Sequence, residues 1–184
     1  MSTATIAPTG TWNVDTTHSR VGFAVKHLGI ATVRGTFKEF EGTLEISDDL
    51  ANAKAYGKVK TASVDTNEAA RDEHLRNSDF FDVEKYPEIT FESTKIEALD
   101  EDSLKIIGNL TINGTTNEVE LLAEVGGTEV DPWGNDRVGL EAVGKISRSD
   151  FGMKFNMALG SGNLAVGDKV TLNLDISAVK APEA

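Results

Sequence analysis

Arg71, Asp72 and His74 are the side chains of this 184-residue sequence whose types and spacing are best suited to chemistry. An arginine can present paired donors to a phosphate or carbonyl group. A histidine near a carboxylate can transfer a proton. The aromatic pair Phe80 and Phe81 follows within a few residues. The segment therefore predicts a polar site beside apolar surface, for a ligand's polar end or for acid–base catalysis.

A helix from about residue 67 to residue 78 is expected to position these side chains. Asn67 suits the N-cap, and Asp72 and Arg76 have the i,i+4 spacing of an ion pair. One stripe of this helix carries Arg71, His74, Leu75 and Ser78. That stripe should face something both polar and apolar.

Around the helix, the chain alternates apolar and polar residues as β-strands do. Residues 31–47 change phase near Lys38 and Glu39, which predicts a β-bulge or a sharp bend. Asn113 and Gly114 predict a tight hairpin turn. About eight strands with hairpin-like connections favour an all-β fold, an antiparallel eight-stranded barrel with one short helix near its mouth. A two-sheet sandwich is the alternative.

Many positions expected to face inward hold small residues. They are Gly35, Ala55, Gly57, Gly108, Ala123, Ala142 and Gly144. Any one glycine could simply relieve barrel curvature. Together they predict an open apolar lumen, since an eight-stranded barrel is just wide enough to hold one small ligand.

Composition and charge exclude several classes of function. The net charge of −12 argues against nucleic-acid binding. No apolar run approaches the ~20 residues of a membrane-spanning helix. We also expect no metal or other cofactor, because cysteine is absent and the three histidines lack ligand spacing. Residues 1–10 are expected to form a flexible leader without the features of a secretory signal, which predicts a cytoplasmic location. Residues 11–180 should form one domain.

Five blocks of sequence, in order, resemble the YceI-like family of polyisoprenoid-binding proteins. They are WNVDTTHSRVGFAVKHLG, VRGTFKEFEGTLEI, RDEHLRNSDFFDVEKYPEITFES, GNLTINGTTNEVEL and ISRSDFGM. The resemblance runs from Trp12 to about Val179 and implies a lipocalin-like barrel. It also implies that the lumen holds a long isoprenoid, such as a polyprenyl phosphate or an isoprenoid quinone.

Strand alternation and the resemblance together give two sets of candidate binding residues. The lumen set is Phe23, Val25, His27, Val33, Phe37, Phe80, Phe81, Phe91, Leu110, Leu121, Leu140, Phe151 and Met153. The head-group set is Arg71, Asp72, His74 and Arg148.

The leading functional hypothesis is a non-catalytic carrier, store or sequestering protein for an isoprenoid lipid or quinone. A second hypothesis is an enzyme acting on a lipid-like substrate, with His74 and Asp72 as acid and base. A third is a structural or partner-binding barrel whose lumen is filled. A homodimer is possible under each hypothesis.

Overall fold

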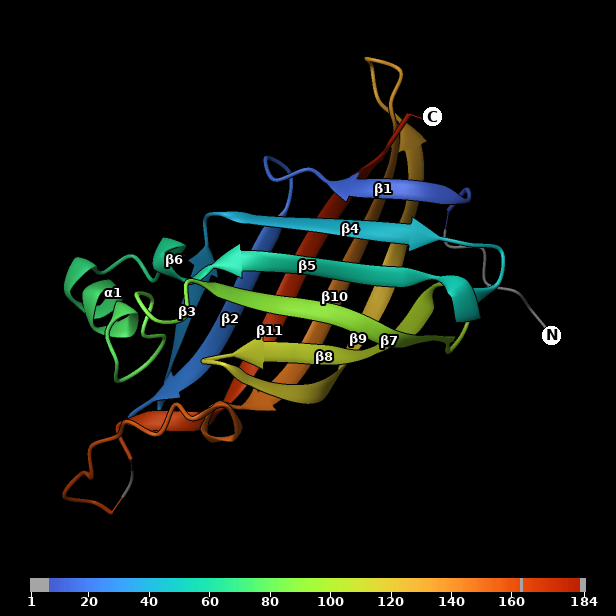
Figure 1. Ribbon diagram of the computed structural model, residues 1–184. Helices are drawn as coiled ribbons and strands as arrows, with labels where there is room; N and C mark the ends of the chain where they lie inside the picture. Colours follow the sequence, from blue (N-terminus) through green and yellow to red (C-terminus); the bar gives the residue numbers. More distant parts are fainter. Residues whose placement is uncertain (1–6, 163, 183–184) are drawn as a thin grey trace.

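The computed structural model describes residues 7–162 and 164–182, and these form a closed antiparallel eight-stranded barrel (Figure 1). The predicted fold class is confirmed. In chain order the strands are β1 (Gly10–Val14), β2 (Arg20–His27), β3 (Ala31–Phe37), β4 (Phe40–Ile46), β5 (Lys54–Lys60), β6 (Val64–Asp65), β7 (Glu88–Ala98), β8 (Ser103–Ile112), β9 (Thr115–Val130), β10 (Asp136–Ser147) and β11 (Val166–Lys180). The helix α1 spans Ala69–Arg76, and 3₁₀ turns occupy Leu50–Asn52, Thr61–Ser63 and Arg148–Phe151.

Two of the eight barrel strands are interrupted, so each consists of two consecutive segments. β1 and β2 form one, since both pair with β11, and β3 and β4 form the next, since β3 pairs with β2 while β4 pairs with β1. From β4 the pairing runs in order through β5, β7, β8, β9, β10 and β11. Because β11 pairs with β1, the sheet closes on itself and most of its strand edges are covered.

The predicted phase change near Lys38 is confirmed as a sharp break between β3 and β4. Phe37 ends β3, Phe40 begins β4, and both side chains lie on the interior surface. Beyond this break β3 has a largely free edge, because β6 pairs only with Thr36 and Phe37. Residues 31–35 therefore have a strand neighbour only on the β2 side.

The predicted hairpin at Asn113 and Gly114 is also confirmed. Ile112 pairs with Thr115, and the two turn residues have φ angles of 52° and 72°. Positive φ at both central residues is the geometry of a type I′ turn.

The helix is shorter than expected, and its predicted cap and ion pair are wrong. Glu68 occupies the N-cap, and its carboxylate accepts a hydrogen bond from the Ala70 amide. Asn67 lies outside the helix in the left-handed region, with φ of 65°. Asp72 contacts Thr66 instead of Arg76.

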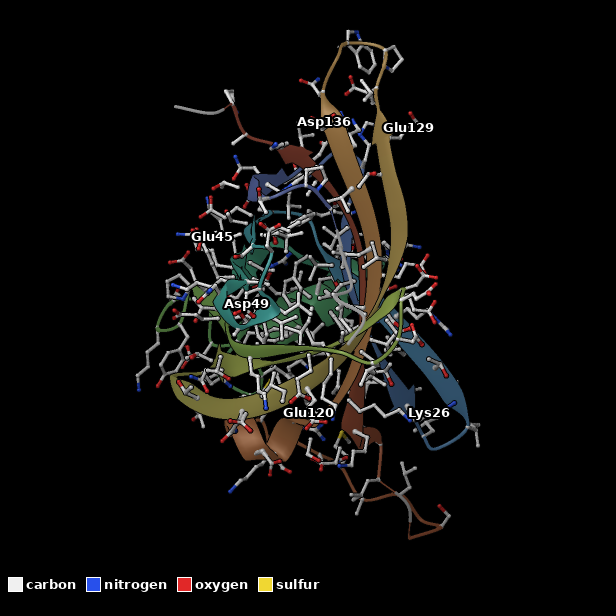
Figure 2. The ribbon with its side chains drawn as sticks, turned by 90° about the vertical axis from the view of Figure 1, so that its right-hand side faces the viewer. Lys26, Glu45, Asp49, Glu120, Glu129 and Asp136 are labelled. Atoms are coloured by element: carbon white, nitrogen blue, oxygen red, sulfur yellow. The ribbon has the colours of Figure 1, made fainter. Side chains whose placement is uncertain are left out.

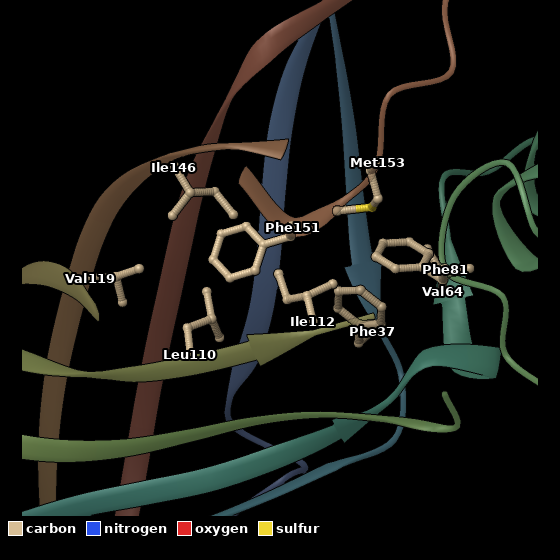
Figure 3. Packing of buried hydrophobic residues seen from close by; sticks show 9 residues of the cluster. All are labelled: Phe37, Val64, Phe81, Leu110, Ile112, Val119, Ile146, Phe151 and Met153. Carbon is tan, nitrogen blue, oxygen red and sulfur yellow. The ribbon is translucent and has the colours of Figure 1, made fainter. Parts of the chain in front are cut away.

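The core lies in three adjoining clusters inside the barrel. Figure 3 shows the cluster nearest α1, where the rings of Phe37 and Phe81 meet edge to face at 5.5 Å. At another site Trp12 is fully buried, and its indole donates to the Pro8 carbonyl. Ala7 is buried as well, so the predicted leader includes at least one packed residue, while residues 1–6 lie outside the described part of the chain.

Candidate functional site

The barrel encloses an apolar cavity of about 520 Å³. Alternate residues of the strands supply its wall, as period-two side-chain alternation requires. On β2 these residues are Val21, Phe23, Val25 and His27, and on β11 they are Val166, Val170, Leu172, Leu174 and Ile176. Several of them keep exposed area although they point inward, because they face open space instead of packed side chains.

The cavity is long and narrow. Its wall follows β11 from Val166 to Ile176, which is roughly 33 Å of strand and about 25 Å along the axis of a barrel with ordinary strand tilt. A volume of about 520 Å³ spread over this length makes the cavity much longer than it is wide. A long, narrow cavity is the shape that one extended hydrocarbon chain requires.

One end of the cavity reaches the surface of the protein. The exposed residues Lys26 and His27 at the end of β2, Met157 on the segment before β11, and Arg71 on α1 all border it. We call this end the mouth. The arrangement lets an apolar molecule lie in the barrel with a polar group near solvent.

The structure brings almost all the predicted lumen residues to the cavity wall. Those that line it are Phe23, Val25, His27, Val33, Phe37, Phe80, Phe81, Phe91, Leu110, Leu121, Leu140 and Met153. Phe151 does not, because it sits in a 3₁₀ turn and is buried in the cluster of Figure 3. It therefore supports the wall without touching the cavity.

The interpretation that inward-facing glycines leave open space is wrong at three positions. A Cβ on Gly35 would lie 2.4 Å from the Phe23 ring, and one on Gly108 would lie 2.6 Å from the Phe91 ring. A Cβ on Gly144 would lie 2.6 Å from a methyl group of Leu121. These glycines make room for large neighbours, so the cavity is bounded by rings and branched chains.

Arg71 is held at the mouth by the loop before α1. Its Nε donates to Thr66 Oγ1 at 2.7 Å, and its Nη2 donates to the Thr66 carbonyl at 2.7 Å. Thr66 in turn donates from both its amide and its hydroxyl to the buried carboxylate of Asp72. Asp72 is thus a positioning residue behind Thr66, and it does not line the cavity.

His74 lies between aromatic rings at the mouth. Its ring centroid is 5.0 Å from that of Phe80 and 4.8 Å from that of Phe155, and both contacts are edge to face. Its Nε2 is 2.8 Å from a carboxylate oxygen of Asp79. The predicted acid–base pair of His74 and Asp72 is therefore wrong, since each side chain has a different partner.

Arg148 is buried on the cavity wall, and its donors go to backbone carbonyls. Nε donates to Gly167, Nη1 to Met153 and Nη2 to Val166, at 2.8, 2.8 and 3.2 Å. Burial lowers the pKa of Arg148, with Asp168 opposing the shift. The side chain ties the segment around Met153 to the start of β11, which leaves it little capacity to hold a head group.

The sequence reasoning missed two parts of the wall. The inward face of β11 was visible as a clean alternation from Val170 to Ile176, but it was not assigned to the binding site. Phe155 and Met157 line the cavity in an extended segment outside the strands, and the alternation of Phe151, Met153, Phe155 and Met157 in the sequence is the signal that could have identified them.

Across residues 7–162 and 164–182, no cluster of three or more His, Cys, Asp and Glu side chains could hold a metal ion. His18 pairs with Asp15, His74 pairs with Asp79, and His27 stands at the mouth. Within the same described ranges, no helix is both long enough and apolar enough to cross a bilayer.

Comparisons with known proteins agree with this architecture. The family model described as YceI-like domain matches residues 12–178. Protein YceI of Escherichia coli is 45% identical over 145 residues, covering 78% of this chain and 75% of its own length.

Two solved structures share the fold. The YCEI protein of Campylobacter jejuni has a TM-score of 0.72 and 34% identity, with 85% of this chain and 90% of that chain covered. A polyisoprenoid binding domain from Saccharophagus degradans, implicated in plant cell wall breakdown, has a TM-score of 0.69 and 16% identity, with 92% and 98% covered. At that identity the second likeness concerns the fold alone.

Proposed function

The chain belongs to the YceI-like family, and we propose that it binds one extended isoprenoid chain in the barrel cavity as a carrier, store or sequestering protein. The polar end of the ligand, a phosphate or a quinone ring, would lie at the mouth.

The observation that carries the proposal is the shape of the cavity. Its wall is almost entirely aliphatic and aromatic, and its long, narrow shape suits a single hydrocarbon chain. Apolar burial contributes about 25 cal/mol per Å², so ~400 Å² of buried tail gives on the order of 10 kcal/mol before the costs of association. Burial of this size supports useful affinity without directional bonds.

The named activity of one structural neighbour gives the proposal its ligand class. The domain from Saccharophagus degradans is described as polyisoprenoid binding, and it shares the barrel architecture. Isoprenoids are linear chains with one small methyl branch in each five-carbon unit, and they carry at most one polar end. Both properties suit a cavity with one exposed end.

Arg71 supports the placement of the head group. Two of its donor nitrogens are committed to Thr66, which fixes the guanidinium plane at the mouth. Its Nη1 has no hydrogen-bond partner among the described residues. A preorganised cation with a free donor can bind a phosphate or a quinone carbonyl.

The two other functional hypotheses fit the geometry less well. The enzyme hypothesis depended on His74 and Asp72, whose side chains have different hydrogen-bond partners. The filled-barrel hypothesis required a packed interior, whereas the barrel holds a cavity of about 520 Å³.

Mass spectrometry of an organic extract of the purified protein tests the proposal. We expect an isoprenoid alcohol, phosphate or quinone in near-stoichiometric amount. The matched control is the same extraction from the Leu172→Trp variant, in which an indole would obstruct the cavity. Equal content of a long isoprenoid in both proteins would contradict binding in the lumen.

The cytoplasmic location and the possible homodimer stay predictions. Cell fractionation tests the first, and analytical ultracentrifugation tests the second.

A further inference from the structure

Exposed apolar side chains surround the mouth of the cavity. Ile30 is 83% exposed, Met157 62% and Leu164 54%. They belong to the turn between β2 and β3 and to the loop that precedes β11. These two loops lie side by side, because the Leu28 amide donates to the Ala165 carbonyl at 2.9 Å. We call the described parts of the two loops, residues 28–30, 157–162 and 164–165, the rim.

The rim continues directly into the cavity. Met157 and Ala165 belong to the rim and also line the cavity wall, as do the neighbouring Lys26, His27 and Val166. An apolar molecule leaving the cavity at the mouth would therefore pass over the rim. A surface that covered the rim would receive it without exposing its tail to water.

The two sequence stretches that contain the rim carry basic residues and no acidic ones, and Asp79, which approaches the mouth from the loop after α1, is paired with His74. Residues 16–38 and 151–167, which contain the rim, are the two longest stretches without an Asp or Glu, although the net charge is −12. Lys26, Arg34 and Lys154 in these stretches are exposed. Asp168 borders the second stretch, but it accepts a hydrogen bond from the Ser149 amide.

The opposite end of the barrel lacks this combination. The hairpin between β9 and β10 exposes Trp133 and Val130, but it also carries Glu129 and Asp136. Figure 2 shows those two acids at the end of the molecule away from Lys26. Exposed apolar side chains coincide with local positive charge at the rim and not at the hairpin.

We propose that the rim docks on an anionic lipid bilayer, so that the mouth opens into the membrane surface. Apolar side chains bind the boundary between head groups and acyl chains, and basic residues are attracted to anionic lipids. The rim's three side chains expose on the order of a few hundred Å², below the ~1,200 Å² that a stable protein interface buries. The small basic patch therefore favours a membrane over a second copy of the chain. The purpose of docking rests on the proposed isoprenoid binding, whereas the docking itself can be measured without it.

Flotation with vesicles tests the proposal, using the full chain and no isoprenoid. The vesicles are phosphatidylcholine alone, or phosphatidylcholine mixed equally with phosphatidylglycerol. We expect the wild-type protein to float with the mixed vesicles only, and added salt to reduce flotation. Ile30→Ser with Leu164→Ser, two exposed rim residues that do not line the cavity, should lower partitioning at least about tenfold. Arg34→Glu with Lys154→Glu, which also lie outside the cavity wall, should lower it by a similar factor.

The matched control is Trp133→Ser with Val130→Ser, which removes equally exposed apolar side chains from the far hairpin. We expect this variant to float like the wild type. Thermal unfolding of each variant establishes that the barrel is folded. Flotation that is absent, that is unchanged by the rim substitutions, or that is equally reduced by the hairpin substitutions would overturn the proposal.

Two further measurements distinguish membrane docking from a contact between copies and from a failure of the proposed isoprenoid binding. If the rim substitutions change the sedimentation of the protein alone, the rim is a contact between copies, and membrane docking is refuted. Binding of an isoprenoid alcohol in vesicle-free solution is measured on the same variants and should be unchanged. Absence of isoprenoid binding by the wild type, with flotation intact, would reject the proposed function while leaving the docking surface in place.

Discussion

Leu172→Trp should shorten the cavity and make isoprenoid affinity depend on chain length. Leu172 lies on the inward face of β11 and contacts two of the core clusters, so it stands between the mouth and the far end. From Val166 to Leu172 the wall runs roughly 20 Å along the strand, or about 15 Å along the barrel axis. An indole there would exclude roughly the last 10 Å of the cavity, since the cavity is long and narrow.

The expected loss follows from the tail that can no longer be buried. A hydrocarbon segment of that length holds on the order of eight carbons, worth about 6 kcal/mol at ~0.8 kcal/mol per CH₂. Part of this burial energy is offset, because a buried tail loses conformational freedom that an unburied tail keeps. We therefore expect about hundredfold weaker binding of a long isoprenoid alcohol. A three-unit isoprenoid alcohol fits in the remaining length and should keep its affinity within about threefold.

The assay is displacement of a fluorescent fatty probe by the long and short alcohols. The control is Leu122→Trp, which places the same indole on an exposed, outward-facing position of β9. Equal losses for long and short ligands in Leu172→Trp, or no loss for either, would refute the elongated binding site.

Three further predictions concern single side chains. Arg71→Ala should weaken a polyprenyl phosphate at least about tenfold more than a bare hydrocarbon of equal length in the displacement assay. Arg76→Ala, which removes a helix arginine that does not line the cavity, should affect both equally. The hydrogen bond from Arg137 lowers the pKa of Asp15 below its ordinary value of about 4. The pair therefore stabilises the fold fully at pH values above about 4, and this stabilisation is lost as the pH falls below it. Urea titrations should accordingly give Arg137→Ala a lower free energy of unfolding than wild type at neutral pH, with the gap narrowing in acid; a constant gap would contradict the pairing. Trp12→Ala should cost about 3–5 kcal/mol of unfolding free energy in the same titrations, because the indole is fully buried.

The strands could be predicted because their information is local. Alternation marks which residues share a face, and the phase change at Lys38 marked the break between β3 and β4. The closure of the barrel could not be predicted in this way. It depends on strand pairs that are distant in the sequence, such as Trp12 with Lys180, and no local pattern specifies their register.

The helix start shows how a neighbouring interaction overrides a local preference. Asn67 is a good N-cap residue, but its amide donates to the Asp65 carboxylate, and its backbone takes the left-handed conformation. The helix therefore begins later, at Ala69, with Glu68 as its cap. Only the geometry of the loop before the helix decides between the two caps.

The residues of the candidate site could be predicted where strand alternation determines which side chains face inward. They could not be predicted where the surroundings of a side chain depend on residues distant in the sequence. The positions of Phe23, Phe37 and Phe91 on the cavity wall follow from strand parity. The surroundings of Arg148 do not, because its carbonyl partners belong to segments that the fold alone brings together. The residue type suggested that Arg148 is free to bind a head group, whereas in the structure its buried guanidinium group binds backbone carbonyls.

The most direct test of the central claim is an experimental structure of the protein with a long-chain isoprenoid alcohol. We predict continuous ligand density along the inward face of β11, beside Leu172 and Leu174, with the hydroxyl group near Arg71 at the mouth. Density on the outer surface of the barrel, or an empty lumen at saturating ligand, would contradict it.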